Sequence, residues 1–247
     1  MDRAAAPPAL ESTQLQQAVD WAIVSRRSIR AFLPAPVAPA VVCDILRVAS
    51  HAASGVNTQP WRVHVLTGGA KDRICNAIAA AHDDPQERAA HEDPYTYYPQ
   101  EWTSPYIDRR RKVGWDLYGL LGIAKGDQPR MHAQHGRNYR FFDAPVGLIF
   151  TLDRVMREGS FIDYGMFLQN VMVAARARGL DTCPQVAFIQ FHRIIARHLQ
   201  IPDSQMVVCG MSLGHADPAA IENTLVTERV DVEAFTTFHT DAGEPSA

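Results

Sequence analysis

Three arginines surround one serine in the segment SRRSIRAF, residues 25–32. Arg26, Arg27 and Arg30 carry guanidinium groups, which stay charged at any working pH and match phosphate oxygens with a planar fork of donors. Together with the hydroxyl of Ser28 they form a candidate phosphate clamp. The alternative is a basic helix end exposed to solvent, where positive charge complements the helix dipole. Taken alone, the segment favours this alternative.

Short polar side chains cluster in a second segment, SGVNTQPWRV, residues 54–63. Ser54, Asn57 and Gln59 lie around Gly55 and lead directly into an alternating apolar segment. Side chains of this kind can present donors and acceptors to a polar heterocycle. The alternative is an ordinary loop between a helix and a strand, and this segment alone does not exclude it.

The segment GMSLG, residues 210–214, fits the G-x-S-x-G pattern of a hydrolase nucleophile elbow, with Ser212 as the candidate nucleophile. The elbow requires a helix directly after the serine, whereas HADPAA turns at Pro218. Too few residues remain to supply an acid and a histidine in chain order. A serine hydrolase is therefore the least favoured function, and a closely packed glycine-rich strand end explains the pattern better.

The other common site patterns are missing. Ten histidines include no H-E-x-x-H spacing, and the four cysteines are far apart with no C-x-x-C pair, so we expect free thiols and no metal site. There is no G-x-G-x-x-G fingerprint. This argues against a Rossmann dinucleotide site but leaves open a flavin that is held differently.

The composition is that of an ordinary globular protein. The chain has 247 residues, of which 47% are hydrophobic and 21% charged, with a formal net charge of -3. This balance gives no sign of a nucleic-acid surface, and no apolar run is long enough for a membrane helix. Because the N-terminal segment lacks an apolar signal-peptide core, we expect a cytoplasmic protein. One domain over residues 1–247 is the simplest arrangement, with residues 1–12 flexible.

The first half of the chain predicts helices, one strand and a long irregular segment. Apolar spacing after Thr13 predicts a helix that runs into the arginines, and a second helix follows Pro39. WRVHVL alternates as a half-buried strand does, and a helix is expected over 71–82. Residues 83–140 form an irregular and partly helical excursion, which we expect to shape a substrate pocket.

The second half predicts two buried strands around a central helix. APVGLIFTLD and QMVVCGMSLG are short apolar runs, typical of buried strands. Between them, Ser160 and Asp163 have the spacing of a capping box, and Gly179 is placed to end the helix. A further helix is expected at 190–199. Helices and strands that do not alternate strictly indicate an α+β fold.

Four segments together resemble the FMN-dependent nitroreductase family: RRSIRAF (26–32), ASGVNTQPWRV (53–63), GLDTCPQVAF (179–188) and LQIPDSQMVVCGMSLGHAD (199–217). The resemblance runs from about residue 17 to 238, and the middle of the chain is most similar to the bacterial branch that reduces nitroaromatic compounds, including dinitroanilines. It implies an α+β fold with a mixed sheet wrapped by helices. It also implies an obligate homodimer with FMN at the subunit interface.

The resemblance assigns cofactor contacts by position. It places the flavin phosphate, ribityl chain and pyrimidine edge at Arg26, Arg27, Ser28 and Arg30, and a polar group that reaches the other subunit's flavin at Ser54, Asn57 and Gln59. Backbone groups near the reactive N5 fall at Pro184, Val186 and Ala187, and a further phosphate contact at Arg229. Some family members have an acidic residue and a glycine in place of Val186 and Ala187, and a lysine in place of Thr227.

The implied reaction is ping-pong reduction of nitroaromatic compounds, with quinones as further acceptors. NAD(P)H delivers hydride to FMN N5 and leaves before the acceptor binds, so no catalytic side chain is expected. Aromatic residues of the excursion are candidates for the substrate pocket, with core or interface packing as the alternative: Tyr98, Trp102, Tyr106 and Trp115. The same fold also hosts dehalogenases, desaturases and a flavin-fragmenting enzyme, and a non-catalytic FMN-binding protein is another open alternative.

Overall fold

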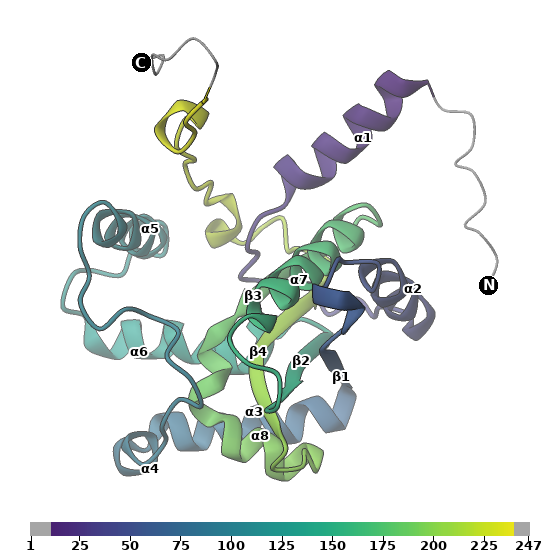
Figure 1. Ribbon diagram of the computed structural model, residues 1–247. Helices are drawn as coiled ribbons and strands as arrows, with labels where there is room; N and C mark the ends of the chain where they lie inside the picture. The colour runs from purple at the N-terminus through teal and green to yellow at the C-terminus, as the bar shows by residue number, and fades with distance from the viewer. Residues whose placement is uncertain (1–10, 240–247) are drawn as a thin grey trace.

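A computed structural model, which describes residues 11–239, shows helices packed around one small sheet (Figure 1). The helices are α1 (Ser12–Ser25), α2 (Pro39–Ala49), α3 (Gly68–Asp83), α4 (Pro85–Ala89), α5 (Tyr106–Leu120), α6 (Gln128–Gly136), α7 (Ser160–Arg176) and α8 (His192–Leu199). The strands are β1 (Trp61–Thr67), β2 (Val146–Asp153), β3 (Asp181–Gln185) and β4 (Gln205–Gly214). Short 3-10 helices are η1 (Gly55–Asn57), η2 (Arg137–Asp143), η3 (Val186–Phe191), η4 (Ile221–Thr224) and η5 (Val232–Ala234).

The sheet has the strand order β1-β2-β4-β3, and all three pairings are antiparallel. The α+β class is therefore confirmed. The prediction of a mixed sheet is wrong for these four strands. The one parallel contact among the described residues is an isolated bridge between Ser28 and Thr182, which joins the arginine segment to β3.

Both faces of the sheet are covered by helices. In β2, Leu148 and Phe150 pack into a core with α2 and α7, whereas Ile149 packs into a second core with α3, η2 and α8. Successive residues of a strand face opposite sides, so a strand buried on both faces needs an unbroken apolar sequence. The apolar run that contains GLIF has this property, and the predicted buried strand is confirmed.

The predicted helices are present, but some of their predicted end residues differ from those in the structure. Pro39 is at the first turn of α2, as predicted, and the strand at 61–66 is confirmed as β1. The predicted capping box at Ser160 is wrong, because Gly159 is the N-cap of α7 and there is no side-chain cap. Gly179 has φ of 71°, the left-handed conformation that ends a helix, as predicted. The first helix begins at Ser12, after Glu11 as N-cap, rather than at Thr13.

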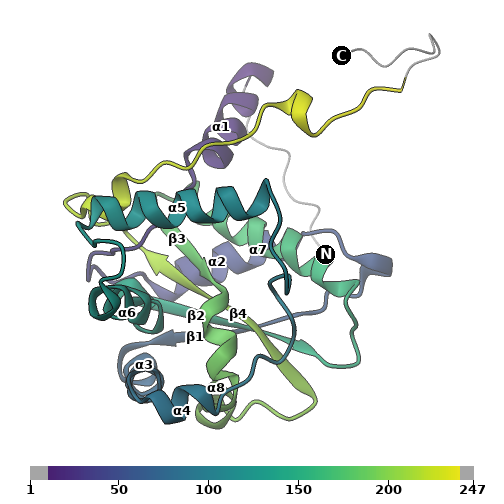
Figure 2. The same cartoon turned by 90° about the vertical axis from the view of Figure 1, so that its left-hand side faces the viewer.

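The long segment between β1 and β2 contains more helix than predicted. After the short α4, residues 90–105 have no regular helix or strand, and α5 and α6 then lead into η2. Figure 2 shows α5 in front of the sheet, away from α3 and α4. The excursion therefore passes from one side of the sheet to another before it returns to β2.

Helix α1 and the C-terminal segment project away from the sheet (Figures 1 and 2). Several of their apolar side chains are exposed, among them Val24 at 81% and Phe235 at 68%. The predicted flexibility of residues 1–12 falls mostly outside the described residues. No helix in the described part of the chain is long and apolar enough to cross a membrane.

Candidate functional site

The arginine segment is extended and begins at Arg26, the C-cap residue of α1. Helix α1 stops at Ser25, and Arg26 has φ of -65° and ψ of 129°. The backbone N–H of Ile29 donates to the carbonyl oxygen of Thr182 at 3.1 Å, which ties the segment to β3. The helix does not continue through the segment, so Arg26 and Arg30 are not one helical turn apart. In an extended chain Arg26 and Arg30 share a side with Ser28, and Arg27 is exposed.

The electrostatics show that these side chains converge. Burial raises the pKa of the Cys183 thiol to about 11, and the positive charges of Arg30 and Arg26 and the Ser28 hydroxyl act in the opposite direction. Burial also lowers the pKa of Arg26, as does the nearby charge of Arg229. Among the described residues no carboxylate forms an ion pair with Arg26 or Arg229. Two positive charges that lie close together without a negative partner suit an anionic ligand.

Asn223 holds this segment in place. Its Oδ1 accepts from the backbone N–H of Arg30 at 2.8 Å, and its Nδ2 donates to the carbonyl oxygens of Ala31 at 2.8 Å and Asp217 at 2.9 Å. The neighbouring Glu222 forms an ion pair with Arg137 of η2. Sequence reasoning missed Asn223, because no local pattern shows that a residue so distant in the chain reaches the arginine segment.

The polar loop after α2 is strained and exposed. Val56, a β-branched residue, has φ of 43° and is 98% exposed, and Asn57 and Gln59 also have positive φ values. The Ser54 hydroxyl accepts from the backbone N–H of Gln59 at 3.1 Å. Strained backbone is often found at ligand sites and contacts. The structure does not place this loop against Arg26.

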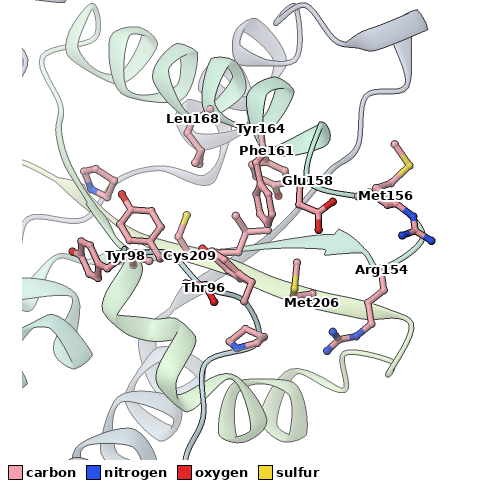
Figure 3. Close-up of a pocket in the computed structure, with 18 of the residues that line it drawn as sticks. Thr96, Tyr98, Arg154, Met156, Glu158, Phe161, Tyr164, Leu168, Met206 and Cys209 are labelled. Atoms are coloured by element: carbon pink, nitrogen blue, oxygen red, sulfur yellow. The ribbon is translucent and has the colours of Figure 1, made fainter. Parts of the chain in front are cut away.

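Two cavities meet at the end of β3. One has a volume of about 1100 Å³ and is lined by Pro184 and Val186, by Phe161 and Leu168 of α7, and by Cys209 of β4. Figure 3 shows Phe161, Leu168 and Cys209 around it, with the labelled Arg154 at its far end. A second cavity of about 500 Å³ is lined by Val186 and Ala187. The three predicted cofactor contacts of this segment thus line open space.

Among the four aromatic candidates, Tyr98 lines both cavities. Trp102 packs against Tyr98 with ring centroids 5.6 Å apart, and the Arg110 guanidinium lies 4.8 Å from the centre of the Trp102 ring. Tyr106 and Trp115 are exposed on α5 and do not line either cavity. Tyr95 also lines the larger cavity, and its hydroxyl donates to the carbonyl oxygen of Val208 at 2.6 Å.

Ser212 lies within β4 and is fully buried. Its hydroxyl donates to Oε1 of Gln185 at 2.6 Å. A nucleophile elbow needs an exposed serine at a turn between a strand and a helix. The hydrolase alternative is therefore wrong.

Three potential metal ligands lie together at the contact between α3 and α6, namely His82, Asp83 and His132. The two imidazole rings are stacked, with centroids 4.0 Å apart and an interplanar angle of 4°. The lone pair of an imidazole nitrogen lies in the ring plane, so parallel rings cannot direct both lone pairs at one ion. The two imidazole rings therefore stack on each other and are not oriented to bind one metal ion together.

Helices on both faces of an antiparallel sheet define an α+β protein, and guanidinium groups without carboxylate partners suit a phosphate-bearing ligand. The profile of the Nitroreductase family matches residues 23–215. The chain therefore belongs to the nitroreductase family.

Curated relatives and solved structures agree with this assignment. The 4-nitrobenzoate reductase of Pseudomonas putida is 44% identical, and the alignment covers 89% of this chain and 94% of the relative. The nitrobenzene nitroreductase of Ectopseudomonas oleovorans is 46% identical over 89% of this chain and 96% of the relative. The FMN- and NADPH-dependent nitroreductase NfnB of Sphigopyxis sp. strain HMH has a TM-score of 0.86 at 35% identity, covering 90% of this chain and 99% of that structure.

Proposed function

We propose that this protein is an FMN-dependent nitroreductase that uses NAD(P)H to reduce nitroaromatic compounds. The relatives at 44% and 46% identity act on 4-nitrobenzoate and nitrobenzene. Similar structures are described as FMN- and NADPH-dependent, and one is a complex with NADPH. The observation that carries the proposal is a cationic segment without acidic partners among the described residues, which is hydrogen-bonded to β3, the strand at whose end two cavities meet.

The residues fit FMN at both of its ends. Arg26, Ser28 and Arg30 provide charged and hydroxyl donors for the phosphate and ribityl oxygens, and Arg229 adds a second charge near Arg26. The backbone N–H groups of Val186 and Ala187 lie in the first turn of η3, where a helix has no internal carbonyl for them, and there is no side-chain cap. Bound FMN supplies hydride transfer at its N5.

A homodimer is part of the proposal. The exposed apolar side chains of α1 and the C-terminal segment favour burial against another chain. The strained loop at 54–59 is also exposed in the single chain. A second copy would bury these surfaces and bring Ser54, Asn57 and Gln59 to its own flavin. The molecular mass in solution tests this.

A cytoplasmic location also remains a prediction, which cell fractionation tests.

The acceptor binds, on this proposal, in the cavities at the end of β3. Apolar and aromatic side chains such as Phe161 and Tyr98 provide flat surfaces for an aromatic ring. The chain then needs only to exclude water and to hold the ring beside the cofactor, because no side chain is required to donate hydride. The excursion 83–140 supplies Tyr95, Tyr97 and Tyr98 to this surface, so it selects the acceptor.

Steady-state kinetics test the proposed function. The rate of NADPH or NADH oxidation is measured as nitrobenzene, 4-nitrobenzoate and a quinone are varied. Double-reciprocal plots should give parallel lines, because a ping-pong enzyme releases the nucleotide product before the acceptor binds. FMN-loaded protein that oxidises neither nucleotide with any nitroarene would contradict the proposal. It would favour another flavin reaction on this fold or an FMN-binding protein without catalysis.

A further inference from the structure

Gln185 connects the end of β3 to two other elements. Its side chain is 3% exposed. Its Oε1 accepts from the Ser212 hydroxyl at 2.6 Å, and its Nε2 donates to the backbone carbonyl of Asn138 in η2 at 2.8 Å. Both ends of the carboxamide are therefore engaged by β4 and η2.

Gln185 is also the N-cap residue of η3. Serine, threonine, aspartate and asparagine at this position accept from the first N–H groups of a helix. Gln185 makes no such bond, and its oxygen accepts from the Ser212 hydroxyl. The N–H groups of Val186 and Ala187 therefore stay available to a ligand in the cavities that these residues line.

Gly210, two residues before Ser212, fixes the same segment by packing. A Cβ at this position would lie 2.3 Å from Cδ2 of Phe188, so the ring rests directly on the strand. Residues two apart in a strand face the same side. One face of β4 thus holds the start of η3 through a hydrogen bond at Ser212 and through ring packing at Gly210.

We propose that Gln185 and Ser212 are positioning residues, which hold the segment 184–187 so that its backbone N–H groups face the flavin ring. The proposal rests on the proposed function, because it takes FMN as the ligand of this segment. It also gives the serine of the GMSLG segment a role, since its hydroxyl orients a carboxamide rather than attacking a substrate.

Amide hydrogen exchange of the protein without FMN tests the positioning step. The variants are Ser212→Ala and Gln185→Met. The matched control is Thr151→Val, which removes another buried hydroxyl, one that donates to Oε1 of Gln205 at 3.0 Å in β2 and does not contact Gln185. Exchange at Phe188 and Ile189, the first amides that bond within η3, should be about 3- to 10-fold faster in the two variants and unchanged in the control, because the start of η3 would open more often. Equal exchange in all proteins would overturn the proposal.

FMN binding separates positioning from a general loss of structure. Oxidised flavin N5 accepts a hydrogen bond, whereas reduced N5 carries a hydrogen of its own and cannot accept from an N–H group. Ser212→Ala should therefore weaken binding of oxidised FMN about 3- to 10-fold and leave binding of the reduced form within about twofold. The midpoint potential would rise by at most about 30 mV, which corresponds to tenfold for two electrons.

Three other results would be decisive. Equal weakening of both redox forms by Ser212→Ala would show a merely structural effect and overturn the inference alone. Unchanged binding of both forms in Ser212→Ala and Gln185→Met would do the same. A native protein that binds no FMN would instead contradict the proposed function, and the inference with it.

Discussion

The four arginines of the candidate site have different surroundings. Arg26 is half-buried beside Arg229, and Arg30 is held through its backbone by Asn223. Arg27 is exposed on the other side of an extended chain. Residue types alone could not separate them, because the sequence leaves open whether α1 continues through the segment. The structure therefore predicts that the arginines contribute unequally to the affinity for an anion.

Alanine substitutions test this division. Arg26→Ala and Arg30→Ala should each weaken FMN binding about 10- to 100-fold, because each removes a charged hydrogen bond worth about 1.5–3 kcal/mol. Arg27→Ala is the matched control and should change affinity by less than about threefold. Fluorescence titration of FMN measures all three. Equal losses at the three positions would contradict the assignment.

Asn223→Ala tests the support of the arginine segment. The change removes three hydrogen bonds and leaves the Arg30 N–H without a partner, so we expect a loss of about 1–3 kcal/mol in the free energy of unfolding and weaker FMN binding. Thr224→Val is the control, because the Thr224 hydroxyl bonds only within its own turn, to Ile221. Urea unfolding and FMN titration of both variants should differ clearly.

At the scale of elements, strands and buried helices were predictable and long-range contacts were not. The apolar runs in the sequence predict that β2, β4 and α7 are buried, because an element that is buried on all sides needs apolar residues. The antiparallel order of the strands depends on pairings such as Val146 with Leu213, which no local pattern specifies. Contacts made by Gln185 and Asn223 also join distant elements, and local sequence patterns do not reveal them.

The contact between β4 and η3 depends on Gly210. In Gly210→Ala the new methyl group would overlap the Phe188 ring, and the ring is fully buried and cannot move aside easily. We expect a loss of about 1–3 kcal/mol in stability, typical of overpacking. Gly119→Ala on α5 is the control, because a Cβ there meets nothing within 4 Å. A stable Gly210→Ala protein would show that η3 is free to shift.

The contact between α3 and α6 should make stability depend on pH. Burial lowers the pKa of His82 below its usual 6.5; His132 and Arg88 act in the same direction, and Asp83 and the His132 carbonyl oppose them. Burial also lowers the pKa of His135. As pH falls through 6.5 the unfolded chain takes up protons that the folded chain does not. The free energy of unfolding therefore decreases as pH falls below 6.5.

Urea unfolding between about pH 7.5 and pH 5.5 measures this effect. The slope should reach at most about 1.4 kcal/mol per pH unit for each histidine. His82→Gln should have a smaller slope than the native protein, since it removes one of the groups. A steeper slope in the variant would show that His82 is charged in the folded state.

For the whole molecule, family membership follows from four short segments and is confirmed by a profile match over residues 23–215. The single chain leaves apolar surface on α1 and on the C-terminal segment, and this agrees with the proposed homodimer. The sequence could not show this, because an apolar residue at a subunit surface looks like one in a core. Substrate choice is the least predictable feature, since the residues that line the cavities come from several distant segments.

Anaerobic spectroscopy of the purified protein tests the central claim most directly. Loaded with FMN, the protein should be yellow, and NADPH or NADH should bleach the flavin absorbance. Addition of nitrobenzene to the bleached protein, with no nucleotide left, should restore the colour. A protein that is colourless after incubation with FMN and removal of the unbound flavin, or one whose bound flavin neither nucleotide bleaches, would contradict the account.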